Sequence, residues 1–308
     1  MGPDGNIWLT VSGNGTIVRM TPKGVSTAFK YTSIGQSLSI TPGPDRALWF
    51  TDIYANLIGK VTTAGVVTTY PLPSNIVNGC QEDATMPLGI IAGPDGAMWF
   101  TVSMGAGGSL SCNPGQPPEI GRITKTGQMT FYSMPATPIG ISPVRITAGP
   151  DGKLWFTTAT NENGSNLGVG SITTSGVITV ATALAGAVQS HDDDYLTFGT
   201  DHNLYVADTI NGTIIRTSGY AAAATFHIPG GLHPYGIVPG PSGTLAFSTD
   251  GNMLGLMTPG GKFTLFPVPS SFGNGIGGGM AFHGKSNLWF PFNGSHGSAN
   301  VVRATITL

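Results

Sequence analysis

The stretch that decides the fold is Gly93-Pro94-Asp95-Gly96-Ala97-Met98-Trp99-Phe100-Thr101. Variants of this stretch occur seven times in the 308 residues, and the position of Trp99 falls at residues 8, 49, 99, 155, 205, 246 and 289. Tyr and Ala replace Trp at 205 and 246, and the other five positions hold all five tryptophans of the chain. Self-similarity at spacings of 41 to 56 residues indicates a repeat architecture, which has to be interpreted before any local signal.

Each repeat is predicted to form four short antiparallel strands, A to D, which in the third repeat are 88–92, 97–102, 120–124 and 128–133. β-Branched and aromatic residues dominate these segments, and Gly, Pro and Asp between them are typical of tight turns. No segment keeps an apolar period of about 3.6 residues, so almost no helix is expected. The sequence therefore predicts an all-β fold, a seven-bladed β-propeller of four-stranded antiparallel blades that forms one domain over residues 1–308.

The two ends of the chain are uneven. The first repeat supplies strands B, C and D, whereas the seventh supplies only A, B and C. Either this numbering starts inside a longer natural chain, or the first and last blades have three strands each. In both cases strand B of the first blade and strand C of the seventh are edge strands of their sheets. An edge strand without a partner can pair with another molecule.

Composition narrows the classes of function. Charged residues are 9% of the chain and the net charge is −2, which excludes the basic patch that a nucleic-acid partner requires. No apolar run approaches the ~18 residues of a membrane span. Low charge and abundant Ser, Thr and Gly favour an extracellular or periplasmic protein. Four Asn-x-Ser/Thr sequons also favour export, although Asn-Gly equally makes turns: Asn14, Asn163, Asn211 and Asn293.

Connections between strands alternate between the two ends of each blade. The A–B and C–D turns are short, whereas the B–C and D–A connections include the long segments 75–87, 104–119, 160–168 and 185–194. We call the end that carries these segments the loop face. Long irregular loops on a rigid scaffold are where binding and catalytic residues concentrate, so the functional site is expected on the loop face.

Three stretches carry a resemblance to a known family: Trp49-Phe50-Thr51-Asp52-Ile53-Tyr54-Ala55-Asn56-Leu57-Ile58-Gly59-Lys60-Val61-Thr62, Pro87-Leu88-Gly89-Ile90-Ile91-Ala92-Gly93-Pro94-Asp95-Gly96 and Ile120-Gly121-Arg122-Ile123-Thr124. They resemble the repeat of the virginiamycin B lyase (streptogramin lyase) family. The resemblance covers essentially the whole chain and implies the propeller fold. It also implies an activity, the Mg²⁺-assisted ring-opening elimination of a cyclic depsipeptide antibiotic.

The resemblance also implies where catalytic histidines should lie, which is at the start of strand A in the last two blades. The sixth blade reads Pro234-Tyr235-Gly236-Ile237 and the seventh reads Gly277-Gly278-Gly279-Met280, so Tyr235 and Gly278 stand in the histidine positions. Elimination needs a base within hydrogen-bond reach of the proton that it removes, and glycine has no side chain to supply one. The family's lyase activity is therefore not expected.

Other residues on the loop face are candidates for a rebuilt site. His233 lies two residues before Tyr235 and would point the same way on an extended strand, so this pair is the candidate catalytic set. In His191-Asp192-Asp193-Asp194, alternation lets Asp192 and Asp194 share one side and bind Mg²⁺ or Ca²⁺ through oxygen, unless the segment is simply a solvated acidic loop. The candidate ligand-binding residues are His191, Asp194, Asp52, Asp208 and Asp250, of which the last three end or follow B strands and could instead bind loop backbone.

Three functions stay open at this point. The leading one is a non-catalytic propeller whose loop face binds a small molecule, glycan or peptide. The second is a lyase or hydrolase with a rebuilt metal-assisted site, a carbon–oxygen lyase if it follows the family. The third is a scaffold domain of a larger surface protein.

Cys80 and Cys112, the only cysteines, are predicted to form a disulfide. Cys80 lies in the D–A loop that enters the third blade and Cys112 lies in the B–C loop of that blade, so both are on the loop face. Closing this loop would stabilise the fold by roughly 3–4 kcal/mol, because it restricts the unfolded chain. Mass spectrometry of a non-reduced digest should find the two peptides joined, and two free thiols would show the prediction to be wrong.

Overall fold

The computed structural model describes residues 1–11, 13–31, 37–73, 86–103, 118–136, 141–160, 167–181, 184, 195–272, 276–293 and 299–306. Nearly all regular structure in these ranges is β-strand. The exceptions are two three-residue 3₁₀ turns, η1 (Pro241–Gly243) and η2 (Ser270–Phe272). No helix within the described ranges has the length and apolar character needed to cross a membrane.

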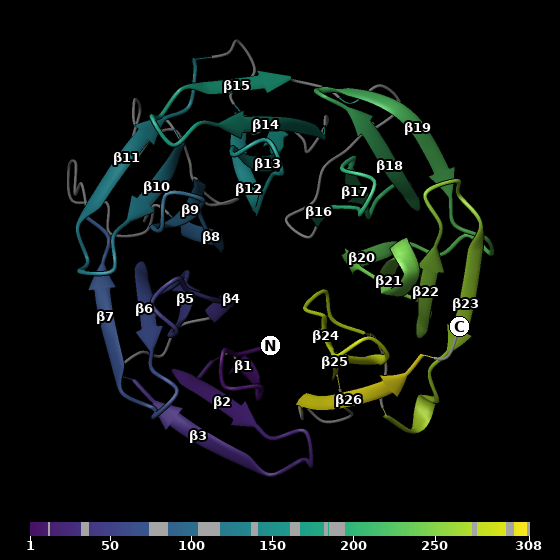
Figure 1. The fold of residues 1–308 in the computed structure, drawn as a ribbon, viewed down its shortest axis with the longest axis horizontal. Helices are drawn as coiled ribbons and strands as arrows, with labels where there is room; N and C mark the ends of the chain where they lie inside the picture. The colour runs from purple at the N-terminus through teal and green to yellow at the C-terminus, as the bar shows by residue number, and fades with distance from the viewer. Residues whose placement is uncertain are drawn as a thin grey trace. The chain divides into compact units, whose positions relative to one another are not determined.

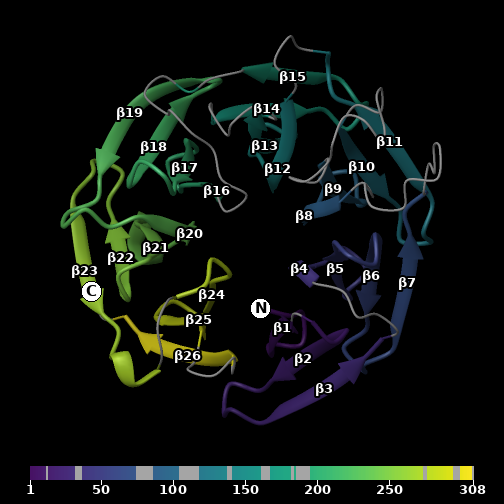
Figure 2. The same cartoon turned by 180° about the vertical axis from the view of Figure 1, so that it is seen from behind.

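The strands form seven antiparallel sheets, called blades one to seven here (Figures 1 and 2). In the first three blades the strands are β1 (Ile7–Val11), β2 (Thr16–Met20) and β3 (Ser26–Lys30); β4 (Ser37–Pro42), β5 (Leu48–Asp52), β6 (Leu57–Val61) and β7 (Val67–Pro71); and β8 (Met86–Ala92), β9 (Met98–Ser103), β10 (Glu119–Ile123) and β11 (Met129–Ser133). Blade four holds β12 (Ile141–Ala148), β13 (Leu154–Thr160), β14 (Gly168–Ile172) and β15 (Ile178–Ala181).

The last three blades continue the pattern with β16 (Leu196–Phe198), β17 (Leu204–Asp208), β18 (Thr213–Ser218) and β19 (Ala221–His227); β20 (Pro234–Pro239), β21 (Leu245–Thr249), β22 (Met253–Met257) and β23 (Phe263–Pro267); and β24 (Ala281–His283), β25 (Asn287–Asn293) and β26 (Ala299–Thr305). Strands pair in chain order within each sheet. The predicted all-β class, the seven blades and the near absence of helix are confirmed.

Blades one and seven have three strands each among the described residues, β1-β2-β3 and β24-β25-β26. Within the same part of the chain, β1 and β26 each pair on one side only. The three-stranded alternative predicted for the two ends is therefore the one that the described residues adopt, and the edges fall on strand B of blade one and strand C of blade seven.

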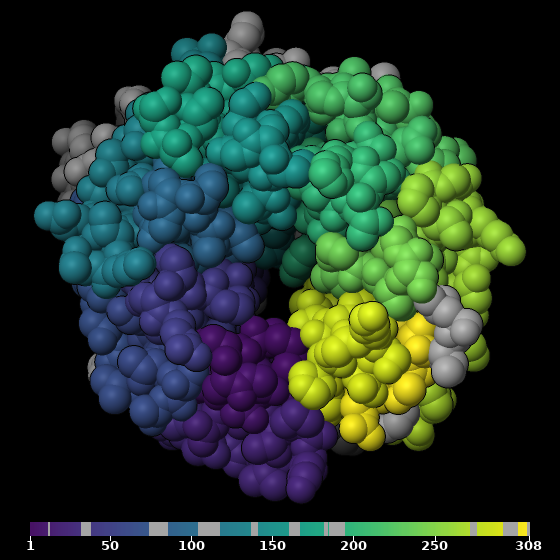
Figure 3. All heavy atoms as spheres, viewed as in Figure 1, coloured from purple at the N-terminus to yellow at the C-terminus, as the bar shows by residue number. Residues whose placement is uncertain are grey.

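The chain divides into two compact units. The first consists of Met1–Trp155 with Ser171–Thr179, and the second of Phe156–Gly170 with Val180–Leu308. The boundary passes through blade four, so blades one to three belong to the first unit and blades five to seven to the second. Within the first unit, the atoms of blades one and two form a continuous surface (Figure 3). That residues 1–308 form a single domain stays a prediction.

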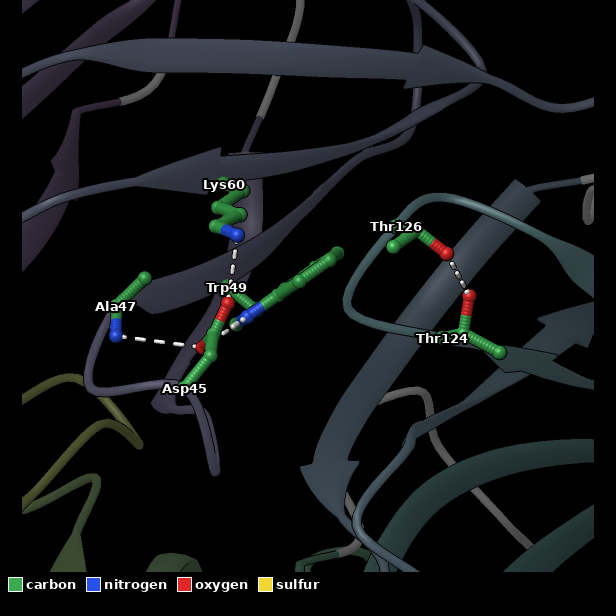
Figure 4. Close-up of polar contacts among 6 residues, drawn as sticks. All are labelled: Asp45, Ala47, Trp49, Lys60, Thr124 and Thr126. Carbon is green, nitrogen blue, oxygen red and sulfur yellow. Dashed lines mark hydrogen bonds and ion pairs between the residues drawn. The ribbon is translucent and has the colours of Figure 1, made fainter.

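The repeated turn holds its tryptophan by a hydrogen bond. The indole Nε1 of Trp49 donates to Asp45 Oδ1 at 3.0 Å, and Lys60 pairs with the other oxygen at 2.6 Å (Figure 4). The equivalent bond from Trp99 to Asp95 is 2.9 Å long. Each aspartate thus joins the A–B turn to the aromatic side chain of strand B.

Blade five keeps this arrangement without a tryptophan. The Tyr205 hydroxyl donates to Asp201 Oδ2 at 2.7 Å. Burial, together with the hydrogen bond to this carboxylate, raises the pKa of Tyr205 to about 12. The Trp-to-Tyr change in the repeat therefore preserves the contact with the turn.

The aromatic side chains of strand B also explain the glycines of strand C. The ring of Phe50 lies directly against Gly59, and the ring of Phe247 lies against Gly255, so a Cβ at either glycine would overlap the ring. Phe50 and Phe247 are fully buried. The glycine in the Ile-Gly-Arg-Ile type of sequence in strand C is thus a requirement of core packing.

Tryptophans pack between neighbouring blades, as the repeat predicts. In the first unit, Trp49 and Ile58 of blade two share one buried cluster with Ile90, Met98 and Phe100 of blade three. Trp49 has no exposed surface, and Tyr70 of strand D stacks on it with ring centroids 5.7 Å apart. Burial of such large rings dominates the energetics of a core.

In several blades, the residue two positions after the tryptophan position has a side-chain hydroxyl that forms a hydrogen bond to the next blade. Thr101 Oγ1 accepts the backbone N–H of Gly89 in its own blade at 2.9 Å and donates to the carbonyl of Val144 in blade four at 2.6 Å. In the second unit, Ser248 Oγ accepts the Gly236 N–H at 3.0 Å and donates to the Gly277 carbonyl at 3.3 Å.

These hydroxyls lie where the ladder of strand A is irregular. The pairing of β8 with β9 shifts between Pro87 and Ile90, and the pairing of β20 with β21 shifts between Pro234 and Ile237. Such irregularities leave backbone groups without ladder partners and re-aim nearby side chains. The hydroxyl satisfies one of those groups and positions the start of strand A.

The contact between Phe247 and Gly255 makes a stability prediction within blade six. Gly255→Ala should lower the free energy of unfolding by about 1–3 kcal/mol, because the added methyl group displaces a buried ring. Gly260→Ala is the control in the same blade, in the turn between β22 and β23, since its Cβ would meet only Thr258 Oγ1 at 3.9 Å. Urea unfolding of both variants measures the difference, and equal stabilities would contradict this account of the glycine.

Candidate functional site

The backbone of His233 is clamped immediately before β20 in blade six. Its N–H donates to Asp250 Oδ1 at 2.9 Å, and its carbonyl accepts the N–H of Asp250 at 3.1 Å. Asp250 is exposed and directly follows β21. The structure therefore uses this carboxylate, a predicted ligand-binding group, to orient the segment that leads into strand A.

The ring of His233 is oriented by blade five. Nδ1 lies 2.7 Å from the carbonyl oxygen of Thr209, and the Thr209 hydroxyl in turn donates to the carbonyl of Pro234 at 2.8 Å. A carbonyl oxygen can only accept a hydrogen bond, so Nδ1 carries a proton. In neutral His233 the lone pair is consequently on Nε2, which is the nitrogen able to accept a proton.

Asp208 and Asp52, the other predicted ligand-binding carboxylates among the described residues, are both 0% exposed. Asp208 accepts the backbone N–H of Asn211 at 3.0 Å and its side-chain amide at 2.8 Å. Burial raises the pKa of Asp208, although the bonds from Asn211 oppose this shift. Asp52 accepts the Tyr31 hydroxyl at 2.7 Å and the Ala55 N–H at 3.0 Å. Both carboxylates stabilise the turns that follow their own strands.

Blades five, six and seven approach each other closely at the starts of their A strands. A Cβ added to Gly236 would overlap the carbonyl of Gly278. A Cβ added to Gly278 would lie 2.5 Å from Cε2 of Tyr195 and 2.9 Å from its Oη. The ring of Tyr195 therefore covers the position at which the resemblance implies a histidine.

Tyr195 was missed by reasoning from the sequence, although the repeat contains the signal. Gly199 is the equivalent of Gly93, and counting back four residues from each gives Tyr195 in blade five and Gly89 in blade three. The position also holds glycine in blade six, Gly236, but Ser39 in blade two and Arg145 in blade four, so Tyr195 is the aromatic residue in this set. Which residue it would contact could not be predicted, because Gly278 comes from a blade two repeats later.

The structure thus brings four sequence positions to one end of the second unit: Tyr195, His233, Tyr235 and Gly278. Tyr235 is partly buried and lies in the irregular start of β20. His191, Asp192, Asp194, Cys80 and Cys112 lie outside the described residues, so the acidic loop and the disulfide stay predictions.

The described residues do not fit a divalent cation. Among them, no group of three or more His, Cys, Asp or Glu side chains gathers at one point. Mg²⁺ and Ca²⁺ need several oxygen ligands, and Asp52 and Asp208 are buried in bonds to their own turns. No chemical step is therefore assigned to a metal here.

A hollow of about 340 Å³ lies on blade three at the opposite end from the loop face, lined by Asp95, Gly96, Ala97, Arg122, Thr124, Lys125 and Thr126. Asp95 pairs with Arg122 at 2.7 Å. Thr124 and Thr126 are joined by a hydrogen bond of 3.0 Å between their hydroxyl groups (Figure 4). Burial alone would raise the pKa of Asp95, but hydrogen bonds from Trp99 and Arg122 outweigh it and lower the pKa. These polar groups already satisfy one another, so the hollow is not a candidate site.

Comparison with known proteins identifies the family. The model of the virginiamycin B lyase family matches residues 1–181 and 102–305. The chain belongs to the virginiamycin B lyase family. The predicted resemblance is confirmed, and with it the fold class of a seven-bladed β-propeller. No curated protein matches the sequence.

Solved structures agree with this assignment. A catalytically inactive histidine-to-alanine variant of virginiamycin B lyase from Staphylococcus aureus, crystallised with quinupristin, is 27% identical, with a TM-score of 0.78 over 100% of this chain and 93% of that chain. A streptogramin B lyase structure is 24% identical, with a TM-score of 0.73 over 94% and 87%. An extracellular domain of a hybrid two-component system from B. thetaiotaomicron shares the fold alone, at 14% identity and TM-score 0.64 over 98% and 38%.

The contact between Tyr195 and Gly278 predicts an energetic coupling. Gly278→Ala should destabilise the protein by about 1–3 kcal/mol, because the methyl group forces the ring to move. The same substitution should cost less in a Tyr195→Ala background, which a double-mutant cycle of unfolding free energies measures. Gly279→Ala is the control, because a Cβ there meets nothing within 4 Å. If Gly278→Ala lowers the free energy of unfolding by the same amount in the wild-type and Tyr195→Ala backgrounds, the contact is disproved.

Proposed function

We propose that this member of the virginiamycin B lyase family is an exported protein that binds a small molecule, glycan or peptide on its loop face. The proposed site is built by Tyr195, His233 and Tyr235, and it lacks the family's ring-opening activity. One observation carries the proposal: the ring of Tyr195 covers Gly278, where a family histidine would stand.

Both histidine positions have changed in ways that oppose elimination. Gly278 offers no side chain, and a histidine there would collide with Tyr195 unless the ring moved. At Tyr235 the imidazole is replaced by a phenol, which at neutral pH donates a hydrogen bond more readily than it removes a proton from carbon. What the altered site retains is aromatic surface and hydrogen-bonding groups, which suit ligand binding.

Export is supported by the low charge of the sequence and by the fold shared with extracellular domains. The proposed partner is a small molecule, glycan or peptide. The low charge of the sequence opposes a nucleic-acid partner.

A second function is favoured by one specific observation. The bond from His233 Nδ1 to the Thr209 carbonyl leaves Nε2 as a base, which a lyase or hydrolase with a rebuilt site would need. Such an enzyme would use His233 in place of the two missing histidines and would act on a different substrate.

The ring-opening activity can be tested directly with quinupristin. We expect no significant opening of the ring, with or without Mg²⁺, because no base occupies either family position. Chromatography with tandem mass spectrometry is the required measurement, since elimination leaves the mass unchanged whereas hydrolysis adds one water. An authentic virginiamycin B lyase is the positive control. Ring-opened product at a rate comparable to that control would overturn the proposed loss of activity.

A further inference from the structure

We propose that His233 is the hydrogen-bond and proton acceptor of the site, that Nε2 is the accepting atom, and that the ligand is a neutral molecule that presents an O–H or N–H group to it. This inference rests on the proposed function, because it names how the ligand of that same site is recognised.

The state of the imidazole follows from its partner. Nδ1 lies 2.7 Å from the Thr209 carbonyl oxygen, which has no proton to give, so Nδ1 is the donor. A histidine whose Nδ1–H is held by a backbone carbonyl presents Nε2 to a ligand, a substrate or a metal. The fold thereby selects one of the two neutral tautomers before any ligand binds.

Blades five and six together hold this geometry. Asp250 binds both the N–H and the carbonyl of His233, and the Thr209 hydroxyl binds the carbonyl of Pro234. Four hydrogen bonds therefore connect the segment around His233 to the ends of β17 and β21. Such pre-organisation lowers the entropy cost when a ligand donates to Nε2.

The surroundings favour a neutral donor. Asp208 is buried and occupied by Asn211, and one oxygen of Asp250 is occupied by the His233 N–H. The imidazole is half-buried beside the start of β20, where Tyr235 follows Pro234. An imidazole nitrogen that carries a lone pair accepts a hydrogen bond from a ligand hydroxyl or amide group.

Two isosteric variants separate the roles of the two ring nitrogens. In His233→Asn, the amide nitrogen can keep the donation to Thr209 O but offers no acceptor at the Nε2 position. In His233→Gln, the amide reaches the Nε2 position but loses the Nδ1 donor. His202→Asn is the control, because His202 lies in the A–B turn at the opposite end of blade five and has φ 63°, which asparagine tolerates.

The protonation state of Nε2 is measured on the wild-type protein by long-range ¹H–¹⁵N NMR in mildly alkaline buffer. We expect an unprotonated Nε2 at His233. Diethyl pyrocarbonate is the chemical probe: the Nε2 lone pair attacks a carbonyl carbon, the bond from that carbon to the central oxygen breaks, and ethyl carbonate leaves. The acylated ring then loses its Nδ1 proton, and protonated ethyl carbonate decomposes to carbon dioxide and ethanol. Peptide mapping should find His233 labelled. An unprotonated Nδ1, or an unlabelled His233, overturns the proposal.

Recognition is measured on arrays of neutral glycans and peptides. Ligands that bind the wild type should bind His233→Asn at least about tenfold more weakly, because one hydrogen bond to a half-buried group is lost. The same ligands should bind His202→Asn as tightly as the wild type. Equal binding by wild type and His233→Asn overturns the role of His233 but leaves the proposed function in place. Binding of no array ligand by the wild type counts against the proposed function itself, while NMR and labelling still decide the state of Nε2.

Discussion

In blades one to five, the hydrogen bond from the strand-B aromatic residue to the aspartate of its own turn is the interaction on which the blade depends. It fixes a large ring against the turn glycine: a Cβ on Gly93 would lie only 2.5 Å from the indole Nε1 of Trp99. The buried ring then forms part of the core between that blade and the next. One short sequence therefore specifies a turn, a strand and a packing surface at once.

A second repeated contact positions the starts of the A strands, where the candidate site lies. The hydroxyl of Thr101, or of Ser248 in blade six, bonds the irregular start of its own strand A and a carbonyl of the following blade. The strand-A starts are thus held by side chains rather than by the ladder alone. Because these segments are released from regular pairing, their residues can vary while the blade stays intact.

Variation at these segments distinguishes this chain from what the family resemblance implies. Gly278 and Tyr235 replace two histidines, and Tyr195 from blade five covers the glycine. His233 is oriented instead, by Thr209 and Asp250, with Nε2 as its basic nitrogen. The family's propeller scaffold is therefore combined with different residues at the positions where the resemblance implies histidines, and one fold can host many functions.

The sequence by itself determined the seven repeats, the turns and the family, because these depend on patterns within about fifty residues that the blades repeat. For the ends it left two alternatives, and the structure shows three strands in blades one and seven among the described residues. The sequence also located His233 and Tyr235 by their distance from a repeated motif. Only the tertiary structure decided that Asp52 and Asp208 are buried in their own turns, that His233 Nδ1 is the protonated nitrogen, and that Tyr195 covers Gly278. Each of these depends on burial or on contacts between neighbouring blades, and residues far apart in the sequence carry no local pattern that reveals which of them will meet.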